Sequence, residues 1–199
     1  LGEADAPGLV GRRISIETTS KVWNACGLRI GALVTDSAVF HQRAVAENTA
    51  SLCANAIGQH IFGAVAHVPH AELQQWFTAQ RAYYGAMLKD FTVRTRELIP
   101  GAVVSSPDAS IYSVVDLRAV VPADFDGVAF VRWCARSGRR EVDGRPLTLL
   151  TAPMAGFYSV PAGRPNPGRT QLRVAYVLPP DQMRLAPDLL AGLLSDYLR

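Results

Sequence analysis

The sequence contains few cysteines, few lysines and no long apolar stretch. Its three cysteines are odd in number and widely spaced, and no CxxC pair occurs, so neither a disulfide framework nor a zinc site is expected. No run approaches the roughly 18 apolar residues that a membrane span needs. No basic and then apolar segment at the N-terminus indicates a secretory signal. Together these features favour a cytoplasmic protein.

The charge balance is weak as well, with a formal net charge of +3 and a pI of about 8.9. An excess of this size does not indicate a nucleic-acid partner, and we interpret the densest basic cluster, residues 136–140, as a solvated helix end and turn. The four histidines match no zinc-ligand spacing, so we expect no metal site. The hydrophobic content of 49% is typical of a globular protein with an apolar core.

The first half of the chain is predicted to form two strands followed by two helices. Residues 1–11 are rich in Gly, Pro and acidic residues and are predicted to be a loop. Residues 13–18 alternate apolar and polar side chains, and residues 27–34 form a second strand-like run. An Ala-rich stretch from residue 37 to about residue 67 predicts one helix. Residues 70 or 71 to 98 predict a long helix with one broad apolar face, which Pro-Gly ends.

The second half changes character, because short strands alternate with helices. Asp124 is expected to cap a helix over residues 125–137, and a final amphipathic helix runs from residue 180 or 181 to 198. Strands are predicted over residues 102–105, 111–116, 147–151 and 171–177. This order predicts a small α+β unit, and we place a domain boundary near residue 95.

The stretch that carries chemistry surrounds Lys21, the only lysine in the first 88 residues. Lys21 follows the end of the first predicted strand and three hydroxyl residues, and Arg29 comes eight residues later between Gly27 and Gly31. Hydroxyls and a guanidinium group are suited to a phosphate. A lysine in a largely apolar surround can act as a nucleophilic amine. A phosphate site beside such a lysine is what a pyridoxal-phosphate Schiff base requires.

The spacing Thr-x-Ser-Lys, followed by Gly, Arg and Gly six, eight and ten residues after the lysine, resembles the signature of class I and II aminotransferases. That family belongs to pyridoxal-phosphate fold type I. The resemblance implies an α/β fold in two parts. Residues 1–95 would be the C-terminal part of the cofactor-binding large domain, including the linking helix, and residues 96–199 the small C-terminal α+β domain.

The resemblance also implies roles for single residues. Lys21 would form the Schiff base with the cofactor, pyridoxal 5′-phosphate, and would carry the proton between the substrate Cα and the cofactor. Thr18 and Arg29 would hold the cofactor phosphate, with Ser20 assisting. We expect Trp23 to contribute packing rather than substrate contacts.

The likeness extends into the second half. Residues 110–118 are similar to the family's first inner strand of the small domain. Residues 171–176 resemble the strand whose arginine grips the substrate α-carboxylate, which would be Arg173. A bidentate guanidinium suits a planar carboxylate. Arg169 is the nearest rival, but it belongs to a Gly/Pro-rich stretch and is less rigidly placed. Tyr158, like Trp23, is expected to pack.

The function that the family implies is transamination between an α-amino acid and a 2-oxo acid, within amino-acid metabolism. Two alternatives stay open: another reaction of the same scaffold (elimination, replacement, cyclisation, decarboxylation or oxidation), or a non-catalytic role. Family members run to about twice this length, so we expect the N-terminal half of the enzyme to be missing here. That half supplies the ring-stacking aromatic and the Asp that pairs with the pyridine nitrogen. The complete protein is expected to be a homodimer, with no nucleic-acid or membrane partner.

Overall fold

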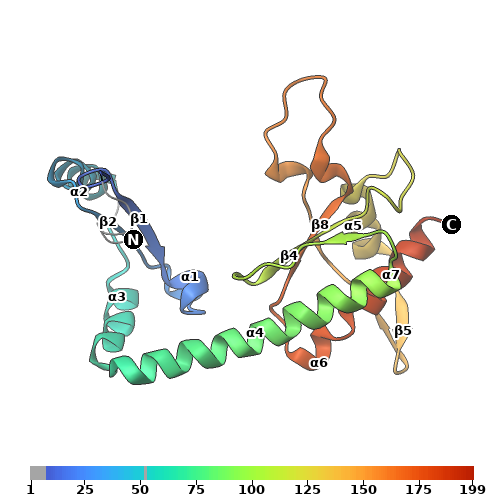
Figure 1. The fold of residues 1–199 in the computed structure, drawn as a ribbon, viewed down its shortest axis with the longest axis horizontal. Helices are drawn as coiled ribbons and strands as arrows, with labels where there is room; N and C mark the ends of the chain where they lie inside the picture. The colour runs from blue at the N-terminus through green and yellow to red at the C-terminus, as the bar shows by residue number, and fades with distance from the viewer. Residues whose placement is uncertain (1–7, 52) are drawn as a thin grey trace. The chain divides into compact units, whose positions relative to one another are not determined.

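The computed structural model describes residues 8–51 and 53–199, which fall into two compact units, Leu1–Gln74 and Gln75–Arg199 (Figure 1). The helix α4, His70–Leu98, gives its first residues to the first unit and the rest to the second, and its bounds confirm the predicted long helix. The domain boundary expected near residue 95 stays a prediction. Of the loop predicted over residues 1–11, residues 1–7 lie outside the described part of the chain.

The first unit is built on an antiparallel ribbon of β1, Ile14–Thr18, and β2, Gly31–Thr35, in which Thr18 pairs with Gly31. At the open end of the ribbon Arg13 forms an ion pair with Asp36, with a distance of 2.6 Å between Nη2 and Oδ2. At the other end lie the one-turn helix α1, Thr19–Val22, and the 3-10 turn η1, Cys26–Leu28. The second strand therefore begins four residues later than the run over 27–34 predicts.

Two helices and a 3-10 turn replace the single helix predicted over residues 37–67. They are α2, Ala38–Ser51, then α3, Ala56–Gly63, and η2, Ala64–His67. The prediction is wrong because Asn55 starts a new helix: its Oδ1 accepts a hydrogen bond from the Gly58 N–H at 3.1 Å. Asparagine side chains compete in this way for backbone groups and favour helix starts over helix interiors.

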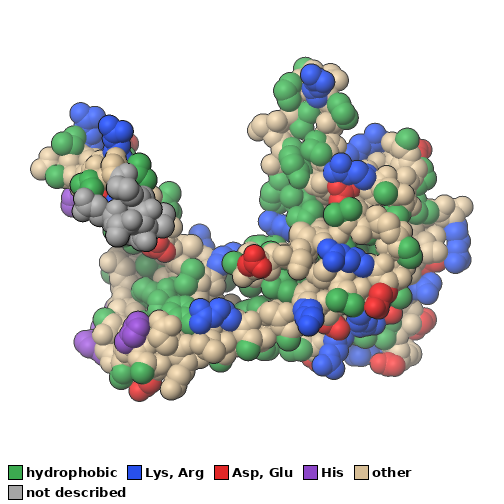
Figure 2. All heavy atoms as spheres, viewed as in Figure 1, with side chains coloured by type: hydrophobic (Ala, Val, Ile, Leu, Met, Phe, Trp, Pro, Cys, Tyr) green, Lys and Arg blue, Asp and Glu red, His purple; other side chains and the backbone are tan. Residues whose placement is uncertain are grey.

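Hardly anything is buried in the first unit. Thr19 and Gly58 are its buried residues within 8–51 and 53–74. Large apolar side chains lie open on its surface instead, with Ile16 79% exposed and Ile57 74% exposed (Figure 2). Both faces of the ribbon and the sides of the helices thus lack a covering layer among the described residues.

The second unit contains a four-stranded antiparallel sheet in the order β3-β4-β8-β7. The bounds of the strands are Val103–Val104 (β3), Tyr112–Asp116 (β4), Ala152–Pro153 (β7) and Gln171–Ala175 (β8). A separate hairpin joins β5, Arg140–Val142, to β6, Arg145–Leu147. The strand predicted over residues 147–151 is therefore wrong: β6 ends at its first residue and β7 begins after its last.

The helices of this unit cover one face of the sheet. They are the second part of α4, then α5, Gly127–Arg136, α6, Pro180–Met183, and α7, Ala186–Tyr197. The turns η3, Ala155–Phe157, and η4, Pro167–Thr170, lie between β7 and β8. Side chains alternate between the two faces of a strand. On β8 Leu172 and Val174 are buried in the core, together with Phe91 of α4 and Leu193 of α7. The intervening Arg173 belongs to the opposite face.

Two details of these helices differ from the sequence prediction. Asp126, and not Asp124, caps α5, because its carboxylate accepts hydrogen bonds from the Val128 and Ala129 N–H groups at 2.7 and 3.3 Å. The C-terminal helix is broken into α6 and α7, with Pro187 in the first turn of α7. Proline has no N–H for a continuous helix and is tolerated where a helix begins. No helix of the described residues is long and apolar enough to cross a membrane.

Candidate active site

Lys21 lies on α1, one residue after a pair of hydroxyl groups. Thr18 caps α1: its Oγ1 accepts a hydrogen bond from the Ser20 N–H at 3.2 Å and lies 3.1 Å from the Ser20 Oγ. Both hydroxyls are at the same corner of the β1–β2 ribbon as Lys21. The structure therefore brings Thr18, Ser20 and Lys21 together, as the sequence predicts.

Thr19, which the sequence interpretation passed over, fixes this corner. It is buried, and its Oγ1 lies 3.2 Å from the Ala25 carbonyl oxygen and 3.1 Å from that of Ile30. Its backbone N–H donates to the Ile30 carbonyl at 3.1 Å. One threonine thus holds both ends of the connection between α1 and β2. The run of three hydroxyl residues is visible in the sequence, but only the fold shows which one points inward.

Arg29 is placed differently from the prediction. It is not on a strand: it follows η1 in the left-handed conformation, with φ 56° and ψ 42°, and its Nη1 donates to the Cys26 carbonyl at 3.1 Å. The turn lies beside the hydroxyl pair, since Thr18 Oγ1 is 3.4 Å from the carbonyl of Ile30, the residue after Arg29. Gly31 then pairs so closely that a Cβ there would lie 2.9 Å from the Glu17 carbonyl oxygen. The ribbon therefore requires a glycine at position 31.

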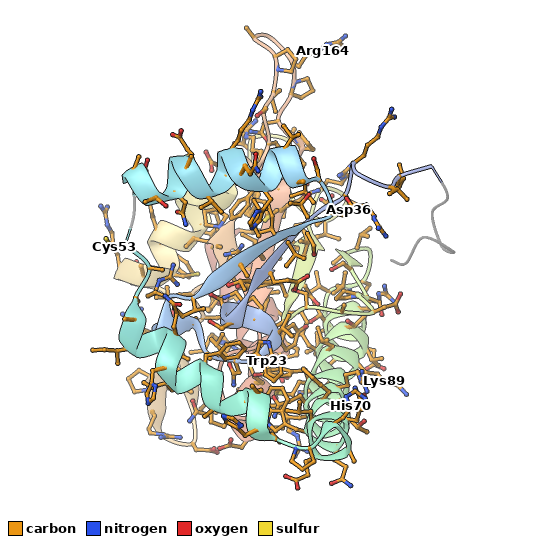
Figure 3. All side chains as sticks on the ribbon, turned by 90° about the vertical axis from the view of Figure 1, so that its left-hand side faces the viewer. Trp23, Asp36, Cys53, His70, Lys89 and Arg164 are labelled. Carbon is orange, nitrogen blue, oxygen red and sulfur yellow. The ribbon has the colours of Figure 1, made fainter. Side chains whose placement is uncertain are left out.

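The start of α3 supports the Arg29 turn from the other side. Asn55 Nδ2 donates to the Leu28 carbonyl at 3.0 Å, and a Cβ on Gly58 would lie 2.6 Å from the same oxygen. Trp23, labelled in Figure 3, packs edge-on against Phe62 of α3, and the ring centroids are 5.3 Å apart, which agrees with its expected packing role. Contacts far apart in the sequence thus hold the corner that carries Lys21.

The largely apolar surround predicted for Lys21 is not formed by the described residues, among which Lys21 is exposed. The reason is the absence of a core in the first unit, where the neighbouring Val22 is itself 52% exposed. The corner therefore places an exposed lysine beside a pair of hydroxyls. Such a donor set fits a phosphate ester beside a carbonyl carbon.

Arg173 lies in the second unit, on the face of β8 that points away from the core. Its Cζ is 4.6 Å from the centroid of the Tyr112 ring and 4.7 Å from that of the Phe157 ring. Its Nε is buried and has no hydrogen-bond partner in the described part of the chain. A buried donor without a partner costs about 1–3 kcal/mol, which a ligand acceptor would recover.

Arg173 differs in this respect from several other arginines of its unit. Arg118 forms an ion pair with Asp116. Arg94 forms one with Asp188, and Arg140 forms one with Asp196. Arg169, the rival carboxylate ligand, donates to the backbone carbonyl of Asp124 at 2.7 Å and thereby supports the loop. Among the described residues Arg173 has ring contacts and no acidic partner. Its guanidinium is therefore open to an external carboxylate.

Next to Arg173 a buried carboxylate organises the same face of the sheet. Burial by itself would raise the pKa of Asp116, but hydrogen bonds from Arg118, Gln171 and Thr170 outweigh it and lower that pKa to about 2. Gln171 Oε1 in turn accepts a hydrogen bond of 2.6 Å from the Tyr158 hydroxyl. Tyr158, which is 39% exposed, thereby ties its loop to β8.

The sequence interpretation missed Tyr112 and Phe157. The alternation of β4 places Tyr112 on the same face as Arg173 once the register is known, because Val114 pairs with Arg173 and Tyr112 with Ala175. Nothing in the sequence pointed to Phe157, which lies in a 3-10 turn sixteen residues before Arg173.

Comparisons with solved structures and with a family model show which proteins the chain is similar to and to which family it belongs. Its structure resembles N-succinyldiaminopimelate aminotransferase from Mycobacterium tuberculosis, with a TM-score of 0.71 at 20% identity over 97% of this chain and 45% of that one. It resembles kynurenine aminotransferase from Pyrococcus horikoshii, solved with PMP, with a TM-score of 0.69 at 21% identity. This match covers 95% of this chain and 42% of that one. It also resembles α-aminoadipate aminotransferase from Thermus thermophilus, solved in complex with N-(5′-phosphopyridoxyl)-L-leucine. The TM-score is 0.71 and the identity 16%, and the match covers 93% of this chain and 42% of that one.

These likenesses show the fold of a type I pyridoxal-phosphate enzyme, and they confirm the predicted α/β class. The family described as "Aminotransferase class I and II" matches residues 3–183, so the chain belongs to that family. The cofactor of this family is pyridoxal 5′-phosphate, and the kynurenine and α-aminoadipate aminotransferases were solved with derivatives of it. No curated protein matches the sequence. The chain spans less than half the length of these solved structures.

Proposed function

We propose that this chain is the lysine-bearing part of an aminotransferase that transfers an amino group between an α-amino acid and a 2-oxo acid. The observation that carries the proposal is the corner at which Lys21 directly follows the paired hydroxyls of Thr18 and Ser20. Its family membership supports the same activity. Arg173 has a buried Nε with no acceptor among the residues that the structure describes, which supports a carboxylate substrate.

Each residue then has a defined task. Lys21 would hold the cofactor covalently through its amine and, once released, would carry a proton at Nζ to and from the substrate Cα. Thr18, Ser20 and Arg29 would bind the cofactor phosphate. Arg173 would bind the α-carboxylate with its planar fork of N–H donors. When bound, pyridoxal phosphate supplies the electron sink that makes the bonds at Cα labile.

The activity needs more polypeptide than the first unit provides. Its ribbon has β1 paired only with β2 within the described residues, and exposed apolar side chains cover its faces. Unpaired strand edges with apolar neighbours bind further strands or aggregate. We infer that the remainder of an aminotransferase large domain covers these faces and shields Lys21 from water. The complete protein is proposed to act as a homodimer, as the family resemblance implies, and to reside in the cytoplasm, in keeping with its few, widely spaced cysteines.

An amino-acceptor assay on the complete protein tests the proposal. Formation of a 2-oxo acid from an α-amino acid should depend strictly on an added 2-oxo acid and on pyridoxal phosphate. Product formed without the acceptor would instead indicate elimination, decarboxylation or oxidation on the same scaffold. A protein that neither binds the cofactor nor forms product would be non-catalytic.

A further inference from the structure

The short segment that carries Phe157 is fixed to β8 at two adjacent places. Phe157 places its ring 4.7 Å from the Cζ of Arg173. The next residue, Tyr158, donates a hydrogen bond of 2.6 Å to Gln171, two residues before Arg173 on the same strand. Gln171 is itself anchored, because its Nε2 donates to Asp116 Oδ2 at 3.0 Å. The segment lies at the base of the loop that projects from this unit, with Arg164 near its tip (Figures 1 and 3).

Burial in the hydrophobic core does not explain the position of Phe157. Its side chain is 55% exposed, and it is not among the buried hydrophobic residues of the unit. An exposed aromatic side chain beside a half-buried cation needs another explanation. The contact with Arg173 is a cation–π interaction, which orients a guanidinium group by its face.

The kind of contact that Arg173 makes decides whether its guanidinium N–H groups can still donate hydrogen bonds to a ligand. A carboxylate partner consumes guanidinium N–H donors, as Asp116 does with Arg118. The rings of Tyr112 and Phe157 lie over the guanidinium and offer no in-plane acceptor. The ring contacts therefore leave N–H donors of Arg173 for a planar, bidentate ligand, and its Nε has no hydrogen-bond partner among the described residues.

We propose that Phe157, anchored through Tyr158 and Gln171, is a positioning residue that holds the Arg173 guanidinium ready to bind the substrate carboxylate. This inference rests on the proposed function, in which Arg173 is the carboxylate ligand. It assigns to the 3-10 turn η3 a part in recognising the carboxylate group that all the substrates share.

The test follows the Arg173 Nε–H signal in the holoenzyme of the complete protein labelled with nitrogen-15 arginine, with propionate and propionamide as probes. Arg173→Leu identifies the signal by removing it. In the unmodified protein propionate should shift this signal and propionamide should not. In Phe157→Leu about two- to fivefold more propionate should be needed for the same shift, in keeping with a cation–π contact at an exposed site. Phe157→Tyr, which keeps the ring, should titrate as the unmodified protein does.

The outcomes separate the inference from the function on which it rests. If the Arg173 signal ignores propionate in the unmodified protein, Arg173 is not the carboxylate ligand and both ideas fail. If the propionate midpoint is the same in Phe157→Leu, and its unfolding temperature is unchanged, the positioning role alone is wrong. With an amino acid that the complete enzyme turns over, Phe157→Leu should raise KM about two- to fivefold and change kcat far less.

Discussion

The two units of this chain bury their side chains in opposite ways. Every buried hydrophobic side chain of the described residues lies between Met87 and Leu194, in the second unit. The first unit, which carries Lys21, buries Thr19 and Gly58 and leaves Ile16 and Ile57 largely exposed. The proposed carboxylate ligand thus belongs to a unit with its own core, whereas the proposed cofactor lysine belongs to one without a core.

The difference shows how each site is held in place. Arg173 stands on a sheet that is backed by helices, so its direction is set within its own unit. The corner around Lys21 is held by hydrogen bonds to backbone carbonyls, from Thr19 and Asn55. Such bonds fix local geometry but remove little apolar surface from water, and burial is the main source of stability. We therefore expect the first unit to depend on further polypeptide for its fold and for a dry site.

The largest expected effect concerns the two lysines of the chain, Lys21 and Lys89. Lys21→Ala in the complete protein should lower transamination by a factor on the order of 10² to 10⁴ or more, because general acid/base catalysis alone contributes that much. Lys89→Ala is the matched control, because Lys89 is exposed on α4 and is not one of the residues that would bind the cofactor (Figure 3). It should leave the rate within about twofold of the original. Equal loss in both variants would remove the special role of Lys21.

Separate expression tests the contrast between the units directly. Residues 70–199, which keep α4 whole, should fold cooperatively, as followed by thermal unfolding in circular dichroism. Residues 1–199 alone should be poorly soluble and should lack the visible absorbance of lysine-bound cofactor, because the apolar ribbon stays uncovered. A stable monomer of residues 1–199 with that absorbance would show that the first unit needs no further polypeptide.

A substitution in the core measures what the second unit has and the first lacks. Leu193 is 0% exposed on α7, and Leu193→Ala in residues 70–199 should cost about 2–5 kcal/mol in urea unfolding, through lost burial and the cavity left behind. Leu198, at the end of the same helix, is 39% exposed and serves as the control. Leu198→Ala should cost less than about 1 kcal/mol. Similar costs at both positions would mean that the core is not tightly packed.

The smallest expected effect is the pH dependence that Asp116 gives to the second unit. Its pKa is lowered from 3.8 to about 2 in the folded state, so its contribution is present above pH 3.8 and is lost as the pH falls towards 2. The contribution should be about 2 kcal/mol at neutral pH. Asp116→Asn should remove it and flatten the stability curve between about pH 4 and pH 2. A variant with the same acid sensitivity as the original would assign that sensitivity to other carboxylates.

Long, periodic elements were predictable from the sequence, and hydrogen-bonded details were not. The helix α4 and the strands β4 and β8 lie close to their predicted ranges, because each has a clear apolar period. The break before α3 depends on Asn55 reaching the Leu28 carbonyl, a contact across 27 residues. Propensity favoured a continuous Ala-rich helix there, and tertiary contacts overrode it.

The candidate site likewise has a part that was predictable from the sequence and a part that was not. The spacing around Lys21 predicted the paired hydroxyls, because residues so close in the sequence cannot lie far from one another at a strand end. The left-handed backbone of Arg29 was not predicted, since non-glycine residues rarely adopt it. The contact of Phe157 with Arg173 joins a 3-10 turn to a strand, and no periodicity links two such elements.

Reductive trapping of the cofactor tests the central claim, that Lys21 is the cofactor lysine, most directly. The complete holoenzyme would be reduced with borohydride, digested and mapped by mass spectrometry, so that the modified lysine is identified without any assumption about the substrate. We predict that the reduced cofactor is attached to the peptide that contains Lys21 and that the peptide containing Lys89 is unmodified. Attachment to Lys89, or to neither lysine of this chain, would contradict the account.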